Sequence, residues 1–215
     1  MGGSSTGIHL DMQSLQSTAA GREALATLHK DKVHIVSGQS GDGASYDAKT
    51  HTLTLDPTDP NPDGTLVRKM AELDYMQKHK HDLNLNLKTA TSHNAYVKAQ
   101  LDKEAYAYAK EFEFDKGAGL KTGNPLQNLF DKACAAFKHK HPHATQQQIY
   151  AAGEKAIREN LGKTVVDGSK TGQTYAQLYG HDFDAHHGSG LPSHNGSGLP
   201  SQGETILALM AKGKL

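Results

Sequence analysis

The sequence predicts an α+β fold that is mostly helical and contains a small antiparallel sheet. Several stretches of helix-forming residues repeat their apolar side chains at intervals of three and four, the spacing of one helix face. Two short β-branched runs, at 33–36 and 52–55, indicate strands near the N-terminus. From about residue 184 the sequence becomes rich in glycine, serine and proline, so the folded region is expected to end there.

The N-terminal part is expected to form one helix followed by the sheet. Ser17 or Thr18 can cap a helix over residues 19–29. The run at 52–55 alternates threonine and leucine, which is the period of a half-buried strand. A glycine-rich stretch and residues 46–50 join the two strands, and we expect the strands to pair in antiparallel fashion.

The segment from residue 56 to residue 81 is predicted to be a break followed by a helix. Three prolines and a glycine between residues 56 and 64 interrupt regular structure, and Thr65 can cap a helix over residues 65–81. The apolar residues of this helix form a single stripe, made of Leu66, Met70, Leu73 and Met76. Glu72 and Tyr75 therefore fall to one side of that stripe.

Helices also account for most of the remaining sequence. They are expected at 94–114, at 125–140 and at 145–161, where Thr145 is the cap, with a shorter one at 174–179. The hexapeptide GSGLPS occurs at 188–193 and again at 196–201, which is typical of a flexible linker. The sequence thus divides into a flexible N-terminus (1–9), one folded domain (10–184), a linker (185–203) and a C-terminal amphipathic helix (204–215).

Charge and composition argue against several classes of function. Lys plus Arg and Asp plus Glu each number 23, so no overall field attracts nucleic acid, and we expect no nucleic-acid partner. No apolar run is long enough to span a membrane, and no Sec-type signal is expected.

The single cysteine, Cys134, lies in an apolar helix face and is expected to be buried and inert. The opening residues match the N-myristoylation pattern with Gly2 as acceptor, and a short artificial Gly/Ser leader is the alternative.

Residues 66–77, LVRKMAELDYMQ, have the form of a zinc-peptidase active-site helix without its histidines. The working motif is His-Glu-x-x-His, in which two imidazoles one turn apart bind zinc and the glutamate is the general base. Here Glu72 occupies the glutamate position, while Ala71 and Tyr75 occupy the two histidine positions. Without the imidazoles, Glu72 has no metal-bound water to deprotonate.

Six segments, read in order, resemble a bacterial family of zinc metallopeptidase-like domains found in secreted effectors and toxin-like proteins. They are STAAGREALATL (17–28), the strand VHIV (33–36), the hairpin SYDAKTHTLTLDP (45–57), LVRKMAELDYMQ (66–77), QLDKEAYAYAKEFEF (100–114) and TYAQLYGHDFD (174–184). The resemblance implies a minimal zincin-like fold. It also implies that Glu72 is the catalytic base position and that Glu104 is a vestigial metal-ligand position, or the carboxylate that supports a ligand.

Three functions are compatible with this resemblance. The first is an inactive domain that needs no cofactor and binds a protein or peptide in the substrate-like groove, by addition to a sheet edge. The second is an active zinc hydrolase whose metal is held by Glu104 and by His79 or His81, with Glu72 as base. The third is an adaptor or structural protein without enzymatic activity. A secreted effector acting in a host or target-cell cytoplasm is expected, or else a cytoplasmic protein.

Overall fold

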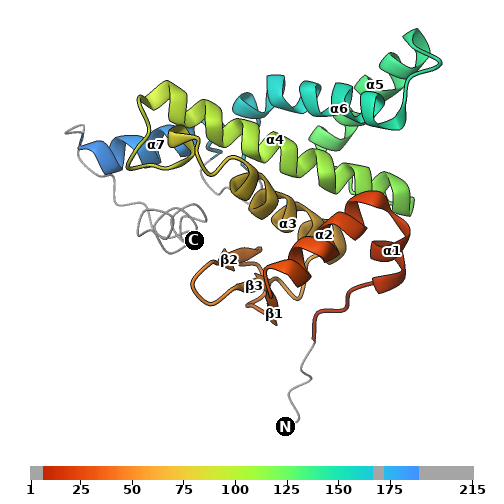
Figure 1. The fold of residues 1–215 in the computed structure, drawn as a ribbon, viewed down its shortest axis with the longest axis horizontal. Coiled ribbons are helices and arrows are strands. Elements are labelled where there is room, and N and C mark those ends of the chain that lie inside the picture. The colour runs from red at the N-terminus through yellow and green to blue at the C-terminus, as the bar shows by residue number, and fades with distance from the viewer. Residues whose placement is uncertain (1–6, 167–171, 189–215) are drawn as a thin grey trace.

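The long helix α4 (His93–Ala118) is the centre of the fold in the computed structural model, which describes residues 7–166 and 172–188 (Figure 1). Most other helices pack against it or against a helix that does. The remaining elements are α1 (Met12–Ser17), α2 (Ala19–Lys30), β1 (His34–Ser37), β2 (Ser45–Asp47), β3 (Thr52–Leu55), α3 (Pro62–Lys78), the short 3-10 helices η1 (Leu83–Leu85) and η2 (Leu161–Lys163), α5 (Pro125–Lys140), α6 (Gln146–Asn160) and α7 (Tyr175–His187). The fold is therefore α+β and mostly helical, as the sequence predicts.

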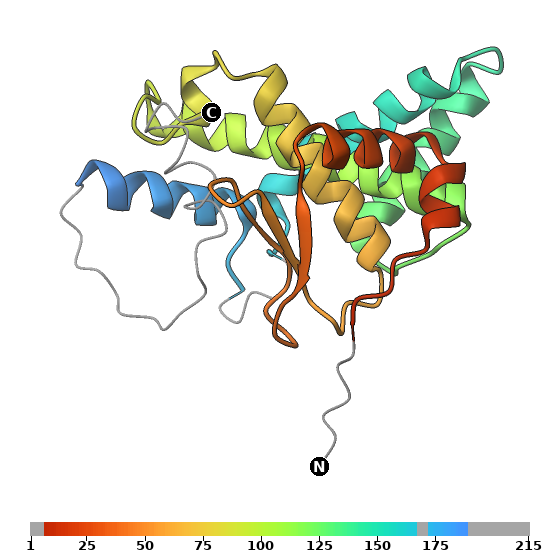
Figure 2. The same cartoon turned by 60° about the horizontal axis from the view of Figure 1, so that its bottom comes forward.

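The helices lie on different sides of α4. Helix α3 packs along one side, and α2 packs across both α3 and α4. Helix α6 packs on another side of α4 and carries α5 with it, while α7 lies against α4 near its N-terminal end (Figures 1 and 2). Because neighbours cover several of its sides, α4 buries aromatic residues on more than one face.

The sheet is mixed, and the predicted antiparallel pairing of the runs at 33–36 and 52–55 is wrong. Strand β1 pairs with β3 in parallel, with Ile35 opposite Leu53. Residues 45–47 form β2 and pair antiparallel with β3, as in the hairpin over 45–57 that the resemblance implies. The strand order is β1-β3-β2. The extra strand adds a second reversal of the chain, so β1 and β3 run in the same direction.

The start of α3 also differs from the prediction. The helix begins at Pro62 rather than after Thr65, and the side chain of Asn61 caps it by accepting a hydrogen bond from the Gly64 N–H. Proline is tolerated in the first helical turn, because its missing N–H would have no partner there. The helix ends at Lys78, three residues before the expected end at 81.

The other helix predictions differ from the structure mainly at their ends. Helix α5 covers residues 125–140 as expected, and Thr145 caps α6 in a capping box with Gln148. Helix α4 continues to residue 118, four residues beyond the prediction, and α1 was not predicted. Helix α7 reaches residue 187, which is past the expected domain end at 184. The linker beyond residue 188, the predicted helix at 204–215 and Gly2 lie outside the described residues.

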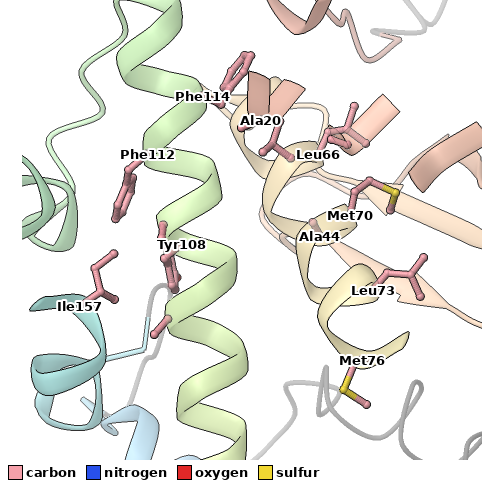
Figure 3. Packing of buried hydrophobic residues seen from close by; sticks show 14 of the residues in the cluster. Ala20, Ala44, Leu66, Met70, Leu73, Met76, Tyr108, Phe112, Phe114 and Ile157 are labelled. Carbon is pink, nitrogen blue, oxygen red and sulfur yellow. The ribbon is translucent and has the colours of Figure 1, made fainter. Parts of the chain in front are cut away.

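The predicted apolar stripe of α3 is buried in the core. Leu66, Met70, Leu73 and Met76 are each at most 4% exposed, and Figure 3 shows Leu66, Met70 and Leu73 on the side of α3 that faces away from α4. On the other side of α4, Tyr108 and Phe112 point toward Ile157 of α6 (Figure 3).

Cys134 is 2% exposed, which confirms that it is buried, and this burial raises the pKa of its thiol to about 11. Among the described helices, none has both the length and the apolar character of a membrane span.

A buried carboxyl group, Asp115, joins three helices at the C-terminal end of α4. It accepts hydrogen bonds from the side chains of Asn61 at 2.9 Å and Gln127 at 3.3 Å. Burial raises the pKa of Asp115 from 3.8 to about 6, although the bond from Asn61 acts in the opposite direction. The group binds its proton more tightly in the folded state than in the unfolded state, so its contribution to stability is present at low pH.

The unfolding of the protein should therefore depend on pH through Asp115. As the pH rises through 3.8 and toward 6, the contribution of this group to stability is lost. Between pH 4.5 and pH 7 the loss is expected to be about 2 kcal/mol. Urea unfolding at both values, for wild type and Asp115→Asn, measures it. An identical pH dependence in the two proteins would contradict the assignment.

Candidate functional site

The Glu72 carboxylate lies inside the protein and is held by a lysine of the same helix. Glu72 is 4% exposed and Lys69 is 8% exposed. The Nζ of Lys69 donates to both carboxylate oxygens, at 2.9 Å and 3.1 Å. The two residues are three positions apart, a spacing that places side chains next to each other on a helix. The predicted general base is therefore a member of a buried ion pair.

Glu104 is also buried, and its partners come from two helices. Its Oε1 accepts a hydrogen bond of 2.7 Å from the hydroxyl of Tyr179 on α7 and lies 3.3 Å from the Nζ of Lys103. Burial by itself would raise the pKa of Glu104, but the charges of Lys103 and Lys69 and the bond from Tyr179 lower it below its ordinary value. Burial and the nearby Glu104 charge raise the pKa of Tyr179 well above that of a free tyrosine.

Glu72 and Glu104 belong to one network. Lys69 binds Glu72 directly and also acts electrostatically on Glu104. In the same way Tyr179 bonds to Glu104 and responds to the charge of Glu72. The structure thus brings together the two acidic side chains that the sequence analysis singled out. It places two ammonium groups beside them.

A second set of groups, of which Arg68 is half-buried, extends the network along α3 and α4. The guanidinium of Arg68 lies 3.2 Å from Glu111, and it donates a 2.8 Å hydrogen bond to the hydroxyl of Tyr108. The Tyr108 hydroxyl is 2.6 Å from that of Tyr175 on α7. Lys103 donates to Gln100 at 3.0 Å. The buried network holds three cations and three carboxylates, which are Arg68, Lys69, Lys103, Glu72, Glu104 and Glu111.

The two positions that correspond to the missing histidines face elsewhere. Ala71 lines a hollow of about 220 Å³ between α2, α3 and α4, whose wall includes Ala24, Tyr106 and Lys110 but not Glu72. The half-buried Tyr75 stacks on His79, with 4.0 Å between ring centroids, and its ring is 5.4 Å from that of Tyr106. Histidines at 71 and 75 would therefore point toward Tyr106 rather than toward Glu104.

The chain matches no protein-family model, and comparisons with curated proteins and with solved structures found no significant similarity. The function of the network must therefore be inferred from its geometry alone.

The buried network does not fit a catalytic zinc ion. A zinc site needs protein ligands with free lone pairs and an open position for water. The carboxylates of Glu72 and Glu104 instead face lysine ammonium groups, which a cation would have to displace. Within residues 7–166 and 172–188, no group of three or more His, Cys, Asp or Glu side chains is placed to hold a metal ion. His79, proposed as an alternative ligand, contacts the backbone oxygen of Tyr75 at 2.9 Å, and His81 is exposed.

The cations of this network were not predicted from the sequence. Lys69, Lys103 and Arg68 look like ordinary solvent-facing residues of helices, because lysine and arginine are seldom fully buried. One signal was available: Lys69 stands three residues before Glu72 and Lys103 stands directly before Glu104. Each carboxylate therefore has a cation close to it in the sequence.

The sheet offers a second candidate surface along the outer edge of β1. The backbone N–H of His34 donates to the backbone oxygen of His51, which directly precedes β3, and that of Gly38 donates to the backbone oxygen of Leu55 in β3, each at 2.8 Å. Because backbone groups alternate along a strand, the N–H groups of Ile35 and Ser37 point away from β3. Val36 is 42% exposed, and the side chain of Ser37 is exposed too. An extended chain placed beside β1 would find these groups available.

Proposed function

We propose that this chain is a catalytically silent, metallopeptidase-like domain that binds an extended segment of another protein along the edge of β1. The observation that carries the proposal is the edge strand itself, whose outward-facing backbone groups lie beside the exposed Val36 side chain. Addition of a strand to a sheet edge is a common way to recognise an extended peptide. Main-chain hydrogen bonds supply affinity in this mode, and alternate side chains supply specificity.

The buried network supports the absence of hydrolytic activity in this proposal. A general base needs contact with a water molecule or a substrate. The carboxylate of Glu72 is instead enclosed and hydrogen bonded to Lys69 through both oxygens. We assign to Glu72 and Glu104 a structural role, the joining of α3, α4 and α7, and the place of the binding surface is the sheet. Action as a secreted effector inside a target cell rests on the sequence resemblance and belongs to the same proposal.

Replacing Ser37 with proline should weaken peptide binding without unfolding the domain. Proline removes the outward-facing N–H of an edge strand, a position where proline is tolerated. The probe is a set of random peptides displayed on phage and selected against the wild-type protein. We expect the selected peptides to bind Ser37→Pro about tenfold more weakly, the effect of losing one or two main-chain hydrogen bonds. Ser37→Ala keeps the N–H and should bind as the wild type does.

Two outcomes would contradict this function. Equal affinity of the selected peptides for wild type and Ser37→Pro, with both proteins folded by circular dichroism, would place binding away from β1. One tightly bound zinc ion per chain in protein purified without a tag, lost in Glu104→Gln, would favour the active hydrolase instead.

A further inference from the structure

Helices α5 and α6 form a hairpin whose turn projects from the body of the protein. Figures 1 and 2 both show this turn at an extremity of the molecule, away from the sheet and from α7. Residues 138–143, which end α5 and begin the turn, are all exposed. We call residues 137–144 the hairpin tip. Its sequence is FKHKHPHA.

The hairpin tip is strongly basic although the whole chain has no net charge. Residues 132–153 contain three lysines and three histidines, and they contain no Asp or Glu. The tip itself holds Lys138 and Lys140 together with the three histidines, which are His139, His141 and His143. Because the charges of the whole chain balance, this excess of basic residues is a local feature of the hairpin tip.

The nearest acidic residues along the hairpin are too distant to neutralise the tip. Asp131 on α5 lies nine residues before Lys140, about 13 Å along the helix axis, and Glu154 lies about 12 Å inside α6. Both distances exceed the Debye length of about 8 Å at physiological salt. Each acid also has its own partner, since Asp131 pairs with Lys116 of α4 at 2.7 Å and Glu154 pairs with Arg158.

The packing neighbour α4 supplies one more acid to this region, at the base of the hairpin. Glu113 acts electrostatically on Tyr150 of α6, and it pairs with Lys110 at 3.4 Å. The charged groups near the hairpin from α4, α5 and α6 therefore leave the field at the tip positive.

Apolar side chains lie among the cations of the tip. Phe137, Pro142 and Ala144 line a hollow of about 380 Å³ together with Lys140 and two of the histidines. The ring of Phe137 is 4.5 Å from that of His141, between centroids. A surface that mixes lysine with aromatic and proline side chains suits the boundary between lipid headgroups and acyl chains.

We infer that the hairpin tip is a docking site for a membrane surface rich in anionic phospholipid. A small convex tip meets a flat surface well, and its lysines can reach lipid phosphates. A nucleic acid is a poorer match, because it is bound by a stripe or groove of basic residues that follows the backbone over a longer distance.

Binding to lipid vesicles tests this inference. The full chain is sedimented with vesicles of phosphatidylcholine alone and with vesicles that contain about 30% phosphatidylserine. We expect binding only to the anionic vesicles. Lys138→Gln/Lys140→Gln should bind about 25-fold more weakly, because each charge is worth about fivefold.

The control removes the same charge from other exposed sites. Lys49→Gln/Lys88→Gln has the same net charge as the tip variant, and both positions are exposed, so it should bind as the wild type does. Equal binding to neutral and anionic vesicles, or equal weakening by both lysine pairs, would overturn the assignment. Tighter binding of duplex DNA than of anionic vesicles by the wild type, lost in the tip variant, would overturn it in favour of nucleic acid. Circular dichroism of each variant verifies that α5 and α6 remain folded.

Discussion

Replacing Lys69 with methionine is expected to lower the free energy of unfolding by about 3 to 5 kcal/mol, the cost of leaving a buried charge without its partner. Methionine keeps the length and the apolar stem of lysine, so packing changes little. What is lost is the ammonium group that bonds to both oxygens of Glu72. The buried network would then hold three carboxylates and two cations. Urea unfolding followed by circular dichroism measures the change.

A second substitution should restore much of the lost stability. In Lys69→Met/Glu72→Leu the network again has equal numbers of cations and carboxylates, two of each. Replacing both members of a buried ion pair with apolar residues is often neutral or stabilising. We therefore expect the double variant to be at least about 2 kcal/mol more stable than Lys69→Met. The exposed lysine of the Lys98–Asp102 pair provides the control, and Lys98→Met should change stability by less than about 0.5 kcal/mol.

The same variants distinguish a structural role of Glu72 from a catalytic one. A Lys69→Met protein that keeps its stability and gains one zinc ion per chain would show that Glu72 and Glu104 are ligands that the lysines merely mask. If Lys69→Met is strongly destabilised and the additional change Glu72→Leu restores stability, the role of Glu72 is structural, because its charge matters only for pairing with Lys69. We expect the second result, because the two carboxylates face ammonium groups and hydroxyls rather than imidazoles.

The helices could be predicted from sequence because their signals are local. Thr145 and Gln148 form their capping box within four residues, and the proline at 125 marks the first turn of α5. The sheet could not be predicted as well. Residues 45–47 are only three residues long, and their pairing with β3 depends on a partner elsewhere in the chain. The direction of β1 relative to β3 follows from that intervening strand.

The candidate site was predictable only in part for a related reason. The sequence suggested that Glu72 and Glu104 act together, and the structure places them in one buried network. It could not show that Ala71 and Tyr75 turn toward Tyr106 instead, since this depends on how α3 rotates against α4. Nor could it show that Tyr179 reaches Glu104 across 75 positions of sequence. Such contacts come from the packing of α7 on α4, which no local pattern records.

The second large effect on stability is expected at Gly153, where α5 packs closely on α6. A Cβ atom at this position would lie 2.4 Å and 2.5 Å from two ring carbons of Phe130, and 2.8 Å from the Sγ of Cys134. These distances are far shorter than van der Waals contact. The Phe130 ring is fully buried and lies between the rings of Phe112 and Tyr150, with centroids 5.9 Å and 5.8 Å away, so it has little room to move.

Gly153→Leu is therefore expected to lower the free energy of unfolding by about 3 kcal/mol, through overpacking between the two helices. In an ordinary helix the same change would be favourable, because glycine is a poor helix former. Ala151→Leu is the matched control, since it adds leucine at an exposed position of α6 two residues away, and it should change stability by less than about 0.5 kcal/mol. Thermal or urea unfolding compares the three proteins. If Gly153→Leu were as stable as the control, α5 and α6 would have to lie farther apart than the structure places them, and the hairpin tip would lose its rigid support.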